Sequence, residues 1–311
     1  MKRRELLKNA AMFGFASAMP LSVAKLNSIV EAAPERNTPP PTANPLQPPK
    51  EGSIPVAFVI SDGAVMIDFA GPWEVFQDAG MATNPGQMVE AFKLYTVAET
   101  TKPIKASAGM KIIPDYSIEN APAPKVIVIP AQHHASKAVL DWIRKSSQSA
   151  DLTMSVCTGA FVLAETGLLS GKTATTHHSS YKVMAMENPD IHVKRGARFV
   201  EDGNIATAGG LSSGIDLALR VVERYYGREA AERTAYDMEY QGKGWMNPDS
   251  NEAYAKIPVS TEDHPLCPVC EMEVNAAGSP KSVYKGKTYH FCMQDHKQAF
   301  DASPDKYLNA T

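Results

Sequence analysis

Four cysteines in two groups are the side chains of this sequence best suited to chemistry. Cys157 stands alone in the run SVCTG, and a lone thiol at a tight turn is typical of a nucleophile. The second group has the spacing C-x2-C followed by C-x3-H, which is typical of a metal site. It consists of Cys267, Cys270, Cys292 and His296. The sequence therefore predicts two sulfur sites with different tasks.

Cys157 is predicted at the turn between a buried strand, 152–156, and a helix that begins at Thr158. The small residues Ser155 and Gly159 permit the sharp turn of a nucleophile elbow, with sulfur in place of the hydroxyl. Backbone N–H groups and the positive end of the helix dipole are expected to lower the thiol pKa and to bind an anionic intermediate. The alternative is a buried structural cysteine.

The chain around Cys157, residues 53–245, is predicted to alternate strands with helices. Buried strands are predicted at 56–60, 92–97, 126–129 and 152–156, of which 56–60 is a continuous apolar run. Helical patterns occupy 71–79, 136–147, 158–167 and 212–226, and a hairpin is predicted between 197–200 and 205–208. This order predicts an α/β fold with a mostly parallel sheet, in which reactive groups gather at the carboxyl ends of the strands.

The C-terminal group offers three thiolates and one imidazole, a closed tetrahedral set that suits zinc. Cys267 and Cys270 come from one turn, and Cys292 and His296 face the same side of a helix at positions i and i+4. Copper(I) is the chief rival because thiolates are soft ligands. A disulfide is the other alternative, since an exported protein meets oxidising conditions. A module as short as 263–311 has little apolar core of its own, so a metal would stabilise it.

The first 33 residues have the layout of an export signal, with Arg3 and Arg4 before a moderately apolar stretch. They resemble the bacterial twin-arginine signal, which implies passage through the twin-arginine machinery to the periplasm. A retained signal that tethers the protein to the membrane and an N-terminal helix of the fold are the alternatives. Residues 34–52 are predicted to be a proline-rich linker, and 246–262 a second linker.

Composition excludes some partners. The net charge of −3, with no basic run beyond the N-terminus, argues against nucleic acid. No other segment is apolar enough to span a membrane, so none is expected once the signal is removed. A small molecule is the expected partner of the thiol.

Several segments in the order expected for one family carry a resemblance: 68–76 (DFAGPWEVF), 155–160 (SVCTGA), 173–177 (TATTH) and 210–216 (GLSSGID). They resemble the DJ-1/PfpI superfamily, also called class I glutamine amidotransferase-like. The similarity is greatest to the branch that holds isonitrile hydratases and the sensor domains of some AraC-type regulators. The resemblance implies a flavodoxin-like sandwich and a homodimer.

The resemblance assigns roles to four residues. Cys157 would be the nucleophile, and Asp68, in the loop after the first strand, the carboxyl that gives it a hydrogen bond or relays a proton. The alternative role of Asp68 is to cap the helix 71–79. Thr158 would offer its N–H to an oxyanion, and His177, with His178 beside it, would reach the site.

Two features depart from the family pattern. His133 and His134 stand in the loop that forms the partner oxyanion site, where relatives usually carry Gly-Gly. Thr158 stands where many amide-hydrolysing relatives have a histidine, which disfavours a peptidase. Both point to a different substrate pocket.

Residues 263–311, which we call the tail, resemble a YHS domain, a small module associated with transition metals. Its family pattern begins Asp-Pro-Val-Cys-Gly-Met and later has two cysteines separated by three residues. Here Cys267 replaces the Asp, Glu271 the Gly and His296 the final Cys.

The leading hypothesis is an exported cysteine-dependent enzyme that hydrates or hydrolyses a small electrophile, with isonitrile hydration as the favoured reaction. The second hypothesis is a non-catalytic periplasmic protein that senses a ligand or thiol stress, or handles metal. A protease or chaperone ranks lower.

Overall fold

The computed structural model describes residues 44–84, 87–133, 135–257 and 259–308. The expected export signal and most of the proline-rich segment lie outside the described residues. Within these ranges, no helix combines the length and the apolar character needed to cross a bilayer.

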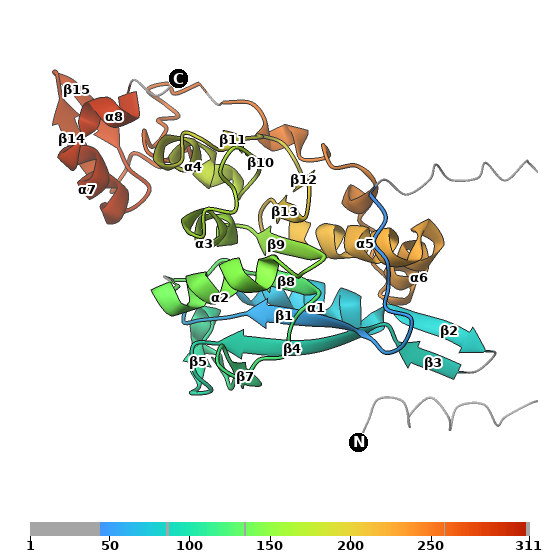
Figure 1. The fold of residues 1–311 in the computed structure, drawn as a ribbon. Coiled ribbons are helices and arrows are strands. Elements are labelled where there is room, and N and C mark those ends of the chain that lie inside the picture. The colour runs from blue at the N-terminus through green and yellow to red at the C-terminus, as the bar shows by residue number, and fades with distance from the viewer. Residues whose placement is uncertain (1–43, 85–86, 134, 258, 309–311) are drawn as a thin grey trace, which may run out of the picture. The chain divides into compact units, whose positions relative to one another are not determined.

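A seven-stranded sheet forms the centre of the molecule, in the order β12-β13-β9-β8-β1-β4-β7 (Figure 1). Neighbouring strands are parallel except for the β12–β13 pair. The strands are β1 (Ile54–Val59), β4 (Phe92–Ala98), β7 (Tyr116–Ser117), β8 (Val126–Ile129), β9 (Leu152–Val156), β12 (Phe199–Asp202) and β13 (Ile205–Ala208). The predicted fold class is confirmed, because the sheet is mostly parallel and the four segments predicted as buried strands correspond to β1, β4, β8 and β9.

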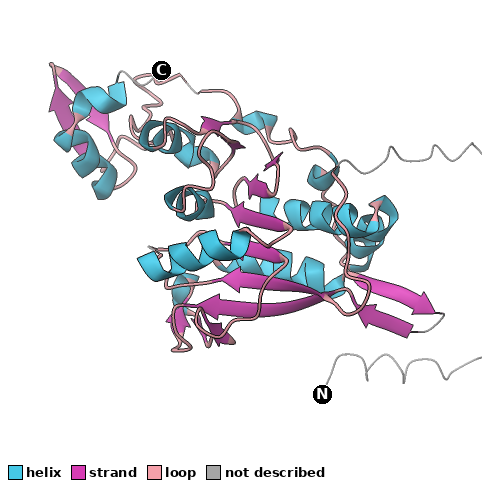
Figure 2. Ribbon diagram, in the orientation of Figure 1, coloured by secondary structure: helices cyan, strands magenta, loops and turns pink. Residues whose placement is uncertain are grey.

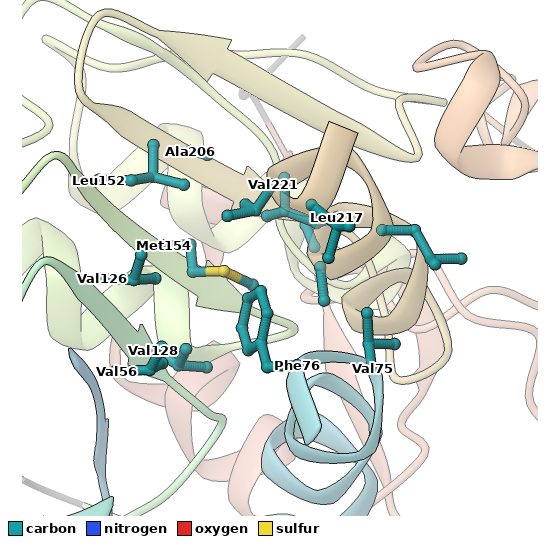
Figure 3. Close-up of a cluster of buried hydrophobic side chains, with 14 of the residues drawn as sticks. Val56, Val75, Phe76, Val126, Val128, Leu152, Met154, Ala206, Leu217 and Val221 are labelled. Atoms are coloured by element: carbon teal, nitrogen blue, oxygen red, sulfur yellow. The ribbon is translucent and has the colours of Figure 1, made fainter. Parts of the chain in front are cut away.

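Two helical layers cover the sheet (Figure 2). The side chains on one face of the sheet pack with three helices: α1 (Met66–Asp78), α5 (Ser213–Tyr226) and α6 (Arg228–Asp237). The side chains on the other face pack with α2 (Lys137–Ser147), α3 (Gly159–Glu165) and α4 (Tyr181–Glu187). In the first layer Phe76 lies among Val128, Met154 and Leu217 (Figure 3). Alternate residues of a strand face opposite sides, so β8 contributes to both cores.

The helix expected at 71–79 begins five residues earlier, at Met66. Asp68 therefore lies in the first turn of α1, and neither in a loop nor at a cap position as expected. The sequence obscured this start because Gly71 and Pro72 are typical of a helix beginning. Pro72 instead lies inside the helix, where it leaves the carbonyl of Asp68 without its usual donor.

Short elements that the sequence did not predict connect the larger ones. They are β2 (Gly80–Asn84) with β3 (Gln87–Glu90), β5 (Ile104–Lys105) with β6 (Lys111–Ile112), and β11 (His192–Val193). β11 pairs with β10 (Thr173–Ala174), the strand expected before His177. Helices α4 and α6 were also not predicted. The boundaries drawn between domains and linkers remain predictions.

The tail contains a hairpin, β14 (Lys281–Tyr284) and β15 (Lys287–His290), followed by α7 (Gln294–Ala302) and α8 (Pro304–Leu308). Its core is small and includes Phe291, Phe300 and two of the cysteines, Cys267 and Cys270.

Glu271 has a φ of 62°. This left-handed conformation favours glycine, which explains why the YHS pattern has Gly at that position.

Candidate functional site

Cys157 lies in the turn that joins β9 to α3, at the carboxyl end of the sheet. Its φ is 57°, a left-handed conformation rare outside glycine and typical of a nucleophile elbow. Its N–H donates to the carbonyl of Gly209 at 2.9 Å, which fixes the turn against the loop after β13. Gly159 is required here, because a Cβ at that position would lie 2.3 Å from the carbonyl oxygen of Ile129.

Asp68 is fully buried beside this thiol. Its Oδ2 accepts a hydrogen bond of 3.1 Å from the N–H of Ala131. Its Oδ1 forms no regular hydrogen bond within the described residues, so this atom is left to interact with Cys157. Burial raises the pKa of Asp68 to about 6, although the bonds from Ala131 and Cys157 lower it. At neutral pH the carboxyl is therefore mostly ionised, yet close to its titration point.

The thiol pKa differs from the sequence-based expectation. Burial and the neighbouring charge of Asp68 raise the pKa of Cys157 to about 11. The helix start does act as expected, because N–H groups of Thr158 and Leu211 and the Thr158 hydroxyl lower that pKa. Desolvation outweighs these donors, since the thiol is only 7% exposed. The resting pair is thus a carboxylate beside a protonated thiol.

Leu211 is a functional residue that the sequence analysis did not single out. Its φ is 41°, and its N–H interacts with the Cys157 sulfur. A branched residue in this conformation is strained, and such strain is common where a backbone group is held for function. The segment 210–216 was noted only as part of a family pattern, and nothing in its residue types indicates which N–H would face the thiol.

His177 lies next to the same turn. The hydroxyl of the preceding residue, Thr176, donates to the carbonyl of Cys157 at 2.9 Å. The Nδ1 of His177 accepts the N–H of Ser179 at 3.3 Å and lies 2.8 Å from the Ser179 hydroxyl. The backbone bond favours the neutral imidazole that carries its proton on Nε2. Burial lowers the pKa of His177 and favours this neutral form. His177 therefore offers an N–H donor, and the ionised carboxyl of Asp68 is the candidate base near the thiol.

The ring of His177 also packs against the loop that carries Leu211. A Cβ at Gly210 would lie 2.4 Å from Cδ2 of His177. Any other residue at position 210 would clash with the imidazole. The ring of His177 therefore packs directly beside Leu211, the residue whose N–H interacts with the thiol.

The loop after β8 does not offer a Gly-Gly oxyanion site. The N–H of Ala131, the second residue after β8, donates to Asp68. The ring of His133 packs over Gly63 in the loop after β1, where a Cβ would lie 2.5 Å from the imidazole. His134 lies outside the described residues. The donors nearest the sulfur are therefore those of Thr158 and Leu211.

The tail brings its four predicted ligands together. The ligand atoms of Cys267, Cys270, Cys292 and His296 lie within 4.8 Å of one another. The sulfurs of Cys270 and Cys292 are 3.6 Å apart, and Nδ1 of His296 is 3.2 Å from the sulfur of Cys292. A tetrahedral zinc ion needs about 3.8 Å between sulfurs and about 3.5 Å between sulfur and nitrogen. The set fits zinc, and all four cysteines of the chain are free rather than in disulfides.

Asp68→Asn is expected to stabilise the protein at pH 8. The pKa of Asp68 is raised from 3.8 to about 6, so its contribution to stability is fully present below pH 3.8 and is lost as the pH rises through about 6. Above that pH window the buried charge of Asp68 lowers the free energy of unfolding of the wild type by about 3 kcal/mol. The free energy of unfolding of both proteins, measured at pH 4 and pH 8, checks this. An equal difference at both pH values would contradict it.

Comparisons with known proteins match both parts of the chain to families. A family model described as the DJ-1/PfpI family matches residues 55–224, and one described as the YHS domain matches residues 267–311. Isonitrile hydratase of Pseudomonas putida is 31% identical over 193 residues, which cover 60% of this chain and 79% of that protein.

Two further matches are more distant. The HTH-type transcriptional regulator GbdR of Pseudomonas aeruginosa is 24% identical over 178 residues, so this chain spans 47% of that regulator's length and 56% of its own. The crystal structure of a THiJ/PfpI family protein from Pseudomonas syringae superposes with a TM-score of 0.54 at 24% identity, covering 70% of this chain and 83% of that one. The latter similarity shows the fold.

Proposed function

Because the chain belongs to the DJ-1/PfpI family and carries a YHS domain at its C-terminus, we propose that it is an exported enzyme that adds water to an isonitrile through Cys157. The observation that carries this proposal is the pairing of a strained elbow thiol with a buried carboxylate and two backbone donors. The similarity to an isonitrile hydratase supports the choice of substrate.

The first half of the proposed reaction forms a thioimidate. The sulfur of Cys157 attacks the terminal carbon of R–N≡C while its proton passes to Asp68. The N–H groups of Thr158 and Leu211 stabilise the negative charge on sulfur as the proton leaves. Asp68 then gives the proton to the same carbon, which yields R–N=CH–S–Cys157. No charge accumulates, because one proton moves from sulfur to carbon.

The second half releases the product. The oxygen of a water molecule adds to the thioimidate carbon while Asp68 takes one proton from that water and passes it to the nitrogen, which gives R–NH–CH(OH)–S–Cys157. The C–S bond then breaks, the hydroxyl proton passes through Asp68 to the sulfur, and the formamide R–NH–CHO leaves. The balance is one isonitrile and one water to one formamide.

The resting charges support this order of events. Asp68 and Cys157 together hold one proton, which is on the sulfur in the resting state. When this proton moves to Asp68, the carboxylate charge that raises the thiol pKa is removed. Because the carboxylate is the base, turnover is expected to fall as the pH is lowered through about 6.

The test is direct. The purified protein is incubated with a simple alkyl or aryl isonitrile, and formamide is followed by NMR or infrared loss of the isonitrile band. Formation of formamide in stoichiometric excess over protein supports the proposal. Absence of both turnover and a covalent Cys157 adduct by mass spectrometry would reject it.

A sensor is the second candidate function, and the match to a transcriptional regulator favours it. A buried, protonated thiol also reacts slowly until a ligand or oxidant reaches it. A sensor would bind an electrophile or become oxidised at Cys157 without multiple turnovers, which the same assay distinguishes.

Three further parts of the proposal rest on the sequence. We propose twin-arginine export to the periplasm, which N-terminal sequencing of the protein from cell fractions tests. A homodimer is proposed from the family resemblance, and sedimentation measures it. The YHS domain is proposed to hold zinc through Cys267, Cys270, Cys292 and His296, where the ion would close the module rather than take part in the Cys157 reaction.

A further inference from the structure

Residues 244–255 follow the region that matches the DJ-1/PfpI model. They are fixed against the α/β part of the chain that surrounds the sheet, which we call the body. The N–H of Trp245 donates to the buried carboxyl of Asp216 at 3.0 Å. The N–H of Arg198 donates to the carbonyl of Pro248 at 2.6 Å. We refer to residues 244–255 as the strap. Its start is thus held by a buried carboxyl of α5 and by the backbone just before β12.

The end of the strap is fixed by close packing at Gly196. The N–H of Asn251 donates to the carbonyl of Gly196 at 3.1 Å. A Cβ at Gly196 would lie 2.6 Å from the Cβ of Ala255. Residues on both sides of Tyr254 therefore have little freedom, and the position of Tyr254 is determined by the body.

Tyr254 ends a stack of three rings that leads to the Cys157 turn. Its ring lies on that of His178, with centroids 4.5 Å apart and planes at 26°. The rings of His178 and His177 follow at 4.3 Å and 37°. Beyond them, His177 packs on Gly210, the residue before the N–H of Leu211 that interacts with the thiol.

We propose that Tyr254 is a positioning residue of the Cys157 site, which holds His178 and, through it, the imidazole of His177 against the donor loop. The bond from Ser179 fixes one edge of His177, but the ring can still tilt about that bond. The ring of His178 limits this tilt from one side, and Tyr254 holds His178 in place by stacking on it, because offset aromatic rings pack best at these separations. The kinetic part of the test rests on the proposed function, whereas the spectroscopic part does not.

The experiment compares Tyr254→Ala with Tyr254→Phe in the full-length protein. Loss of the ring is expected to lower kcat/KM for an isonitrile about 10-fold, mainly through kcat, because the donor loop is less well ordered. Phenylalanine keeps the stack and is expected to restore the rate. In long-range ¹H–¹⁵N spectra, the His177 signals of the Nε2–H form should shift or broaden in the alanine variant alone.

Tyr236→Ala is the matched control, since Tyr236 lies on α6 and is 82% exposed. It should change neither the rate nor the His177 signals. Unchanged kinetics and unchanged His177 signals in Tyr254→Ala would overturn the proposal, as would an equal loss in the alanine and phenylalanine variants. If the wild type hydrates no isonitrile, the proposed reaction fails, and the His177 signals still decide the role of Tyr254.

Discussion

Replacing Cys157 with serine is expected to lower formamide formation from an isonitrile by about 10³-fold or more while the protein stays folded. A hydroxyl is far less acidic than a thiol, so the carboxylate of Asp68, with a pKa of about 6, cannot remove its proton at a useful rate. Serine differs by one atom and fits the same turn, and the free energy of unfolding should change by no more than about 1 kcal/mol. Steady-state kinetics and denaturant unfolding measure the two effects.

Cys157→Ala is the companion variant, because it removes any nucleophile and shows whether residual activity in the serine variant is covalent. In the wild type, stopping the reaction early should trap a mass increase equal to the isonitrile on the peptide that contains Cys157. Turnover that survives in both variants would show that another group carries the reaction. A variant that is inactive because it is unfolded would be recognised by its circular dichroism.

Local patterns were sufficient to predict the sheet and the elbow. A continuous apolar run predicted β8 with its bounds, because strands covered on both faces need no polar side chains. The bounds of β9 were also predicted correctly, although this strand contains Thr153 and Ser155. The elbow at Cys157 was predicted from small neighbours, and its φ of 57° agrees with them. These features depend on residues within a few positions of one another in the chain.

Properties that depend on distant segments were not predictable in the same way. The thiol pKa was expected to fall, yet burial by the whole core and the charge of Asp68 raise it. The start of α1 was misplaced because Gly71 and Pro72 imitate a helix beginning. The donor at Leu211 and the ring of Tyr254 reach the site through tertiary packing, and no local pattern records that.

The metal site was predictable in part, because its spacing is a local pattern whereas the distances between its ligands depend on the fold. Its spacing predicted the four ligands, and the fold places their atoms within 4.8 Å of one another. Spacing alone left a disulfide open, whereas the structure has free thiols separated by distances suited to a tetrahedral ion. The small apolar core around Phe291 and Phe300 is the reason to expect a bound ion to matter for stability.

Removing the metal is expected to unfold residues 263–308 while the α/β body stays folded. Structural zinc contributes about 10–16 kcal/mol of apparent binding energy in small modules, far more than this core can supply alone. Hydrogen exchange of the full-length protein before and after chelation measures the effect, with amides of β14, β15 and α7 expected to exchange about 100-fold faster or more. Metal analysis of the untreated protein should give one zinc per chain.

His296→Ala tests the same site without a chelator, and it is expected to weaken zinc binding about 100-fold or more. His290→Ala is the matched control, because His290 is also half-buried in the tail but bonds to the hydroxyl of Ser279 at 3.0 Å and lies outside the ligand cluster. Competition with a zinc indicator compares the two variants, and a parallel titration with copper(I) identifies the preferred ion. Equal affinity in both variants, or a tail that keeps its slow exchange without metal, would show that the cluster is not a structural zinc site.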